Sequence, residues 1–215
     1  MLQNTPGFPA LLSEDRLRDS VDTLLTMQNA DGGFASYELI RAGPWLESLN
    51  AAEVFGKIMV EYSYPECTTA TITGLALFRK YYPNYRTEEI EATIQCAVKF
   101  VKEQQRPDGS WYGAWGVCFL YATMFATESL HLVGENYDNS ESARRACEFV
   151  VSKQREDGGW GESWRSSHDA VYIQHEDSQV VGTSWALIAL MNAGYPRKEV
   201  LERGAKVSNL CIRQL

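Results

Sequence analysis

Apolar residues recur along the chain at intervals of three and four positions, the spacing that places them on one face of an α-helix. Three segments show this pattern with polar residues on the other face: residues 17–28, 94–105 and 144–154. They are predicted to be amphipathic helices. Their apolar faces contain Leu17, Val21, Leu24 and Leu25, then Ile90, Ile94, Ala97, Val98 and Val101, and finally Ala146, Cys147, Val150 and Val151.

Three other segments alternate with these and are apolar around most of the helical circumference. They are "ECTTATITGLALFRKYY" (66–82), "WGVCFLYATMFATESLHLV" (115–133) and "SQVVGTSWALIALMNAG" (178–194). Such helices are buried on several sides. The chain is therefore predicted to be all-α, with helical hairpins packed side by side and outer helices covering inner ones.

The ends of the amphipathic helices carry local signals. Ser13, Thr87 and Ser140 are expected to be N-caps, because each is followed by acidic residues in the first turn. Glycine after the last turn of each helix can adopt the left-handed conformation that ends a helix.

A short pattern follows each amphipathic helix: "QNADGGF", "QRPDGSW" and "QREDGGW". Three copies at comparable positions indicate an internal repeat. The glutamine amide is expected to bond backbone groups near a helix end, with the ring covering it, so that one hairpin is tied to its neighbour. The residue pairs are Gln28 and Phe34, Gln105 and Trp111, and Gln154 and Trp160.

Composition narrows the functional classes. The 215 residues carry a net charge of −8 with no basic tract, which argues against a nucleic-acid partner. The five cysteines include no C-x-x-C pair and indicate reduced thiols. The first 20 residues lack a signal-peptide pattern, and the longest apolar stretch, from Gly116, is too short to span a bilayer.

No other cluster of polar residues predicts chemistry well. The segment "HDAVYIQHED" holds His168 and His175, but their spacing of seven in a polar stretch does not favour a metal site. Adjacent Ser167, His168 and Asp169 do not make a catalytic triad, and the glycine pairs lack the context of a phosphate loop. These residues therefore predict neither a metal site nor a phosphate-binding loop.

The repeats and the stretches around them resemble the oxidosqualene cyclases of the lanosterol-synthase type, in the terpene cyclase/mutase family. The resemblance is carried by "NADGGFASYEL", "LNAAEVFGKIMVEYSYPECTTA", "QQRPDGSWYGAWGVCF" and "QREDGGWGESW", and it runs over nearly the whole chain. The order and spacing are those of the C-terminal half of the family.

The resemblance implies an α/α-toroid, a partial α6-α6 barrel built on glutamine–tryptophan (QW) repeats. Residues 1–215 would form one partial C-terminal toroid domain, truncated at both ends. The family converts 2,3-oxidosqualene into a sterol-type triterpene such as lanosterol through acid-initiated carbocations, without a cofactor. Its members are peripheral, monotopic proteins of the endoplasmic reticulum membrane or of lipid droplets, so contact with a membrane is expected.

The resemblance also assigns site residues. The Asp-Cys-Thr-Ala-Glu motif that carries the family's proton donor is absent from the chain, and the donor is expected to lie before Met1. "ECTTA" matches the family segment whose cysteine hydrogen-bonds that acid, so Cys67 is the candidate helper. A hydrogen bond to the carboxylate stabilises its ionised form and makes it a stronger acid.

Other residues match rings and apolar groups that line the family's cavity. Trp115, Tyr37 and Phe55 are expected to stabilise carbocations through cation–π attraction, worth roughly 0.5–2 kcal/mol per ring. Ile58 is expected to be a neighbouring apolar wall residue. Trp111 and Trp160 belong to the repeats and are interpreted as structural.

The C-terminal segment "VLERGAKVSNLCIRQL" begins like another repeat helix and reaches Gln214 without the following turn. With the acid and the last cavity wall outside these residues, the isolated chain is expected to be inactive, with some inner-helix surface exposed. Two alternatives stay open. One is a non-catalytic half-toroid that binds lipid or an intact cyclase; the other is a zinc-dependent protein prenyltransferase β subunit, whose metal-ligand pattern is not seen around His131.

Overall fold

Helices and the turns between them make up the chain. The computed structural model describes residues 12–51 and 59–212, and within these ranges β-type pairing is limited to two isolated bridges. The prediction of an all-α chain is confirmed. The elements are α1 (Glu14–Thr26), the 3₁₀-helix η2 (Pro44–Leu49), α2 (Pro65–Tyr81), α3 (Thr87–Glu103), α4 (Cys118–Leu132), α5 (Glu141–Ser152), α6 (Arg165–Asp169), α7 (Val180–Asn192) and α8 (Lys198–Ile212).

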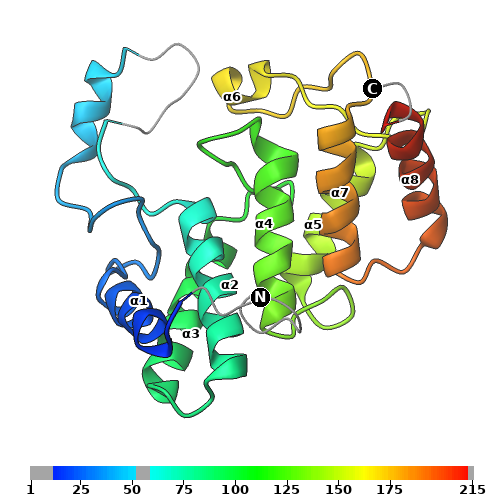
Figure 1. The fold of residues 1–215 in the computed structure, drawn as a ribbon. Helices are drawn as coiled ribbons and strands as arrows, with labels where there is room; N and C mark the ends of the chain where they lie inside the picture. The colour runs from blue at the N-terminus through cyan, green and yellow to red at the C-terminus, as the bar shows by residue number, and fades with distance from the viewer. Residues whose placement is uncertain (1–11, 52–58, 213–215) are drawn as a thin grey trace.

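Helices α2, α4 and α7 form an inner row. They stand side by side and run in the same direction, with their N-terminal ends at the top of Figure 1. Helix α4 packs against both of the others. Their apolar sequences suit this place, because Ile72, Leu120 and Leu190 are fully buried.

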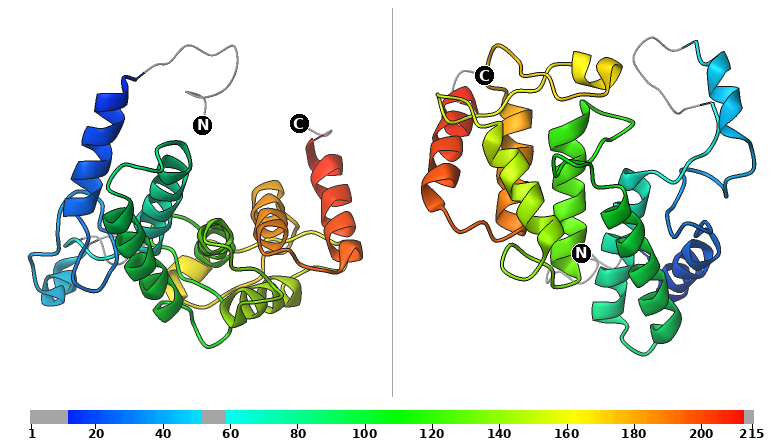
Figure 2. Two further views of the ribbon diagram at one scale, coloured as in Figure 1. Left: turned by 90° about the horizontal axis from the view of Figure 1, so that it is seen from below. Right: turned by 180° about the vertical axis from the view of Figure 1, so that it is seen from behind.

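The amphipathic helices form an outer row. Helix α3 packs on α2, α8 packs on α7, and α5 contacts both α4 and α7. Seen along the helices, the two rows follow an arc, with α1 at one end and α8 at the other (Figure 2, left). The described chain is therefore an open section of an α/α-toroid, as the family resemblance implies, and its outer helices cover its inner ones, as the alternation of buried and amphipathic helices predicts.

The core consists of two apolar clusters, one on each side of α4. The first joins α1, α2, α3 and α4 and contains the Trp111 ring. The second joins α4, α5 and α7 and contains the Trp160 ring. Both indoles are 0% exposed. Removal of a buried ring of this size costs about 3–5 kcal/mol, so these two side chains are central to the stability of the rows.

Two of the three expected N-caps are confirmed. The hydroxyls of Ser13 and Ser140 accept hydrogen bonds from the first turns of α1 and α5. The prediction for Thr87 is wrong. Arg86, in a left-handed conformation with φ +43°, precedes α3 as its N-cap, and Thr87 is already helical. The Thr87 hydroxyl instead donates to the carbonyl oxygen of Pro83 at 2.6 Å.

Candidate functional site

Three turns of the same construction lead from an outer helix to the next inner helix. In each turn the glutamine Nε2 donates two hydrogen bonds of 2.9 Å, one to a glycine carbonyl of its own turn and one to the next outer helix. The turn thus fastens consecutive hairpins together. The donor and its two acceptors are Gln28 with Gly32 and Thr93, Gln105 with Gly109 and Ser142, and Gln154 with Gly158 and Val200.

The aromatic residue that ends each turn is bonded to the next inner helix, and the two tryptophans are bonded to an outer helix as well. The indole N–H groups of Trp111 and Trp160 donate to the carbonyls of Val101 and Val150 in the outer helix behind them, at 2.6 and 2.7 Å. The backbone N–H of each ring residue donates to a threonine hydroxyl of the next inner helix. These pairs are Phe34 with Thr68, Trp111 with Thr123, and Trp160 with Thr183.

Glycine is required inside these turns. Gly109 has φ +91°, and a Cβ atom there would lie 2.3 Å from the carbonyl oxygen of Arg145 in α5. Gly32 and Gly158 have the same conformation and comparably close neighbours in α3 and α8. The "DGG" and "DGS" sequences therefore allow each turn to lie directly on the next outer helix.

Cys67 lies in the first turn of the inner helix α2 and is partly buried. Burial and the charge of Glu66 raise the pKa of the Cys67 thiol to about 11, although a hydrogen bond with Ser36 acts in the opposite direction. The thiol is consequently protonated at neutral pH. It is able to donate a hydrogen bond to an acceptor placed beside α2.

Trp115 lies in the loop that precedes α4, and its side chain is 44% exposed. Its ring is tilted against the ring of Tyr64, the N-cap residue of α2, with the centroids 5.0 Å apart. The backbone N–H of Trp115 also donates to Glu66 in the first turn of α2. Trp115 and Cys67 are therefore brought to the same end of the inner row.

Tyr37 is placed differently. Its side chain is 85% exposed, in the segment between α1 and η2, and no interaction with Cys67 or Trp115 is present among the described residues. Phe55 and Ile58 lie outside the described residues. The cavity roles expected for these three side chains stay predictions.

Sequence reasoning missed an aromatic row along the inner helices. The Tyr121 ring packs edge-on against Phe125 at 5.1 Å and tilts against Trp185 of α7 at 5.5 Å. Burial and the nearby Glu66 carboxylate raise the pKa of the Tyr121 phenol above its ordinary value. The helical spacing of Tyr121 and Phe125 could have shown that they share a face, but not that Trp185 lies opposite.

An open pocket of about 410 Å³ lies between the N-terminal ends of α4 and α7. Its wall is mostly apolar and includes Leu120, Trp164, Val181 and Trp185, with Glu162 as the acidic member. Aromatic and aliphatic side chains with few polar groups are typical of sites for apolar ligands.

Glu162 is a second residue that sequence reasoning missed. It is 3% exposed, and its carboxylate accepts from the backbone N–H groups of Cys118, Phe119 and Leu120 at the start of α4. Burial raises the pKa of Glu162, and these donors oppose that shift. The letters "GWGES" gave no signal that this acid reaches another helix.

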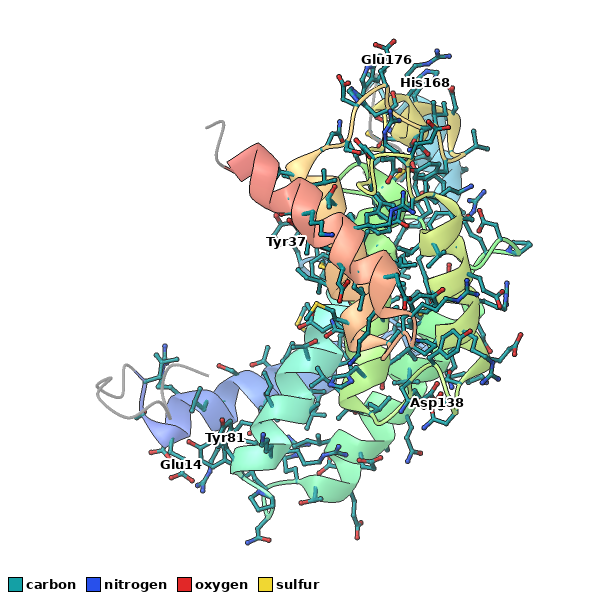
Figure 3. The ribbon with its side chains drawn as sticks, turned by 90° about the vertical axis from the view of Figure 1, so that its right-hand side faces the viewer. Glu14, Tyr37, Tyr81, Asp138, His168 and Glu176 are labelled. Atoms are coloured by element: carbon teal, nitrogen blue, oxygen red, sulfur yellow. The ribbon has the colours of Figure 1, made fainter. Side chains whose placement is uncertain are left out.

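The histidine-rich segment lies at the edge of the molecule, where Figure 3 labels His168 and Glu176. His168 Nδ1 is 2.6 Å from the Asp169 carboxylate, and His175 bonds the backbone of Asp177. Among the described residues, no group of three or more His, Cys, Asp or Glu side chains could hold a metal ion.

The two-row fold and its repeated turns define a toroid domain of the terpene-cyclase class. A family model described as the squalene-hopene cyclase C-terminal domain matches residues 11–214. The chain therefore belongs to this cyclase family, and the resemblance to oxidosqualene cyclases is confirmed.

Curated relatives support the same family. The chain is similar to lanosterol synthase erg7A of Aspergillus fumigatus, with 61% identity over 206 residues, 96% of this chain and 27% of that protein. It is also similar to a lanosterol synthase of Pneumocystis carinii, with 56% identity over 95% of this chain and 28% of the relative. The chain thus spans less than a third of the length of these relatives.

A solved structure shares the fold. The ent-copalyl diphosphate synthase from Streptomyces platensis superimposes with a TM-score of 0.63 over 86% of this chain and 30% of that chain. The two sequences are 18% identical, so this likeness supports the helical architecture alone.

Proposed function

We propose that this chain forms part of a triterpene cyclase that converts 2,3-oxidosqualene into a sterol-type polycyclic product. The observation that carries the proposal is the grouping of Cys67, Tyr64 and Trp115 at one end of the inner row. The level of identity with lanosterol synthases supports the choice of substrate.

In this proposal the residues have separate tasks. The protonated Cys67 thiol hydrogen-bonds the acid that protonates the epoxide, which favours the ionised state of that acid and strengthens it. The faces of Trp115 and Tyr64 attract the carbocation that follows. The mostly apolar pocket wall that includes Trp185 presents few nucleophilic groups to the cation.

A chimera tests the proposal. Residues 11–214 replace the matching segment of the Aspergillus fumigatus lanosterol synthase, and cyclic products of 2,3-oxidosqualene are identified by mass spectrometry. We expect a tetracyclic triterpene from the chimera, and at least a tenfold loss of rate with Trp115→Ala. Trp115→Phe, which keeps an aromatic face, should retain more activity than Trp115→Ala.

A folded chimera that yields no cyclic product would contradict the proposed function. Equal rates for Trp115→Ala and the unchanged chimera would contradict the role of that ring while leaving the function standing.

We also propose that the lipid substrate is met at a membrane or lipid-droplet surface. In the described ranges, no helix combines the length and the apolarity needed to span a bilayer. Flotation of the chimera with phosphatidylcholine vesicles tests this contact, and recovery of all protein in the soluble fraction would speak against it.

A further inference from the structure

Glu66 is a buried acid beside Cys67 that the proposed chemistry leaves without a task. It lies in the first turn of α2 and is 5% exposed. Its Oε1 accepts hydrogen bonds from the backbone N–H groups of Ala114 at 2.6 Å and Trp115 at 3.2 Å. Because the acceptor is a carboxylate, these bonds are stronger than bonds between neutral groups.

The Glu66 side chain also interacts with the Tyr121 phenol of α4, whose pKa is raised by burial, by the Glu66 charge and by a hydrogen bond to Glu66. Its second oxygen, Oε2, is buried and has no hydrogen-bond partner among the described residues. Buried polar atoms usually have partners, so an acid retained here needs a reason. The loop that carries Trp115 supplies both backbone donors to this acid.

The loop reaches Glu66 because residue 113 is a glycine. A Cβ atom on Gly113 would lie 3.0 Å from Glu66 Oε1 and 2.6 Å from Cε1 of Tyr121. A side chain at this position would therefore force the Tyr121 ring, the Glu66 carboxylate or the loop to shift. The close approach at Gly113 and the two hydrogen bonds to Glu66 both show that this loop is attached to the start of α2.

The hydrogen bonds between Glu66 and the loop fix the position of Trp115 relative to Cys67. Glu66 precedes Cys67 directly in the chain, and it bonds the backbone of Trp115, whose ring rests on Tyr64. The Trp115 side chain is 44% exposed and its ring packs against Tyr64, so the backbone bonds to Glu66 are a second constraint on its position.

We infer that Glu66 is a positioning residue of the cation-binding wall, which holds the Trp115 indole in place relative to Cys67. This inference rests on the proposed function. It assigns Glu66 a geometric task, so a neutral amide with an oxygen in the same place should perform it nearly as well. Glu66→Gln is therefore the matched control for Glu66→Ala.

The first measurement is hydrogen exchange of the Ala114 and Trp115 amides in the 215-residue chain. Glu66→Ala removes their acceptor, and we expect exchange to become at least about tenfold faster. Glu66→Gln should exchange within about threefold of the unchanged chain. Gly113→Ala keeps the acid but displaces the loop, and it should resemble Glu66→Ala.

The second measurement is the affinity for two probes of similar size. Binding is detected by tryptophan fluorescence, at probe concentrations below the critical micelle concentration. Dodecyltrimethylammonium carries a positive charge, whereas dimethyldodecylamine N-oxide has no net charge at pH 8. We expect Glu66→Ala to weaken the ammonium probe about three- to tenfold and to leave the N-oxide unchanged, because a displaced ring loses its cation–π contact. Glu66→Gln should bind both probes like the unchanged chain.

The outcomes separate the inference from the proposed function. An unchanged chain that binds both probes alike contradicts the cation-binding wall itself. If the unchanged chain binds the ammonium probe more tightly than the N-oxide and the Glu66→Ala chain shows the same preference, the role of Glu66 is contradicted. The positioning role of Glu66 is also contradicted if the Glu66→Gln chain loses ammonium binding while its Ala114 and Trp115 amides stay protected from exchange. In that case the charge of Glu66, and not the position of the loop, would determine binding. Circular dichroism excludes unfolding of each variant.

Discussion

The first of the three turns differs from the other two in one group. Phe34 occupies the position of Trp111 and Trp160, and it is equally buried, at 2% exposed. A phenyl ring has no N–H, whereas each indole donates to a carbonyl of its own outer helix. The first outer helix, α1, is also sparsely covered, since Val21 is its one buried residue among those described.

The comparison separates two functions of the repeat. The glutamine bonds, the glycine conformation and the threonine contact are present in all three turns, and they join one hairpin to the next. The indole N–H adds a tie within the hairpin. An end position can lose that tie without losing the arrangement of the rows.

The largest expected effect follows from removing a ring. Trp111→Ala should lower the free energy of unfolding by about 3–5 kcal/mol, and Phe34→Ala should cost less because no indole bond is lost. Trp111→Phe converts the second turn into a copy of the first and should cost about 1–2 kcal/mol. Urea denaturation measures all three, and equal losses for Trp111→Ala and Phe34→Ala would refute the distinction between the turns.

A smaller effect is expected at the turn glycine. Gly109→Ala combines a strained φ of +91° with a Cβ 2.3 Å from the Arg145 carbonyl, and it should cost about 2–4 kcal/mol. Gly134, after α4, has φ +84° but open space around its Cβ position, so Gly134→Ala should cost about 1 kcal/mol. Thermal unfolding measures the stability of both variants. Similar losses would show that backbone strain, and not the contact with α5, determines the cost of Gly109→Ala.

Loss of the amide tie should be milder. Gln105→Ala removes two hydrogen bonds to carbonyls, and we expect a loss of about 1–3 kcal/mol. Gln95→Ala, at a surface site where the amide meets Glu91, should change stability by less than about 0.5 kcal/mol. Chemical denaturation measures both. If the two variants behave alike, the glutamine does not join the hairpins.

The smallest effect is a pH dependence in the third turn. Burial acts to raise the pKa of Asp157, but the Gly159 N–H, the Ser178 hydroxyl and nearby arginines outweigh it and hold the pKa below its ordinary value. The stabilisation is therefore present above about pH 4 and is lost as the pH falls through the lowered pKa.

Asp157→Asn keeps an oxygen acceptor but removes the titrating group. We expect its free energy of unfolding to fall less than that of the unchanged chain on acidification from about pH 5 to pH 3. Asp138→Asn controls for the loss of one surface charge. Parallel pH profiles for Asp157→Asn and the unchanged chain would contradict the assignment.

The order of the helices could be predicted from the sequence because hydrophobic periodicity and three copies of one turn pattern agree. Both signals are local, as are the caps at Ser13 and Ser140. The prediction for Thr87 failed because the left-handed conformation of Arg86, whose guanidinium bonds Asp22, moves the helix start by one residue.

The candidate site could be predicted only where a resemblance pointed to it. Cys67 and Trp115 were expected, but the acid between them in space was not. A glutamate in a first helical turn is usually read as a solvated group, and nothing in "PECTTA" indicates that Glu66 is covered by a loop almost fifty residues later. Long-range contacts of this kind depend on how the rows pack, which sequence periodicity does not encode.

Because the three inner helices run in parallel, their N-terminal dipole ends all face the end of the row where a carbocation is proposed to form. Each such end carries roughly half a positive charge and would repel the intermediate. The Glu162 side chain lies across the start of α4, and its carboxyl oxygens accept hydrogen bonds from the first free N–H groups of that helix, so these donors are satisfied within the fold. One of the three parallel helix ends therefore has its free backbone donors occupied by an acid from the turn that follows α5.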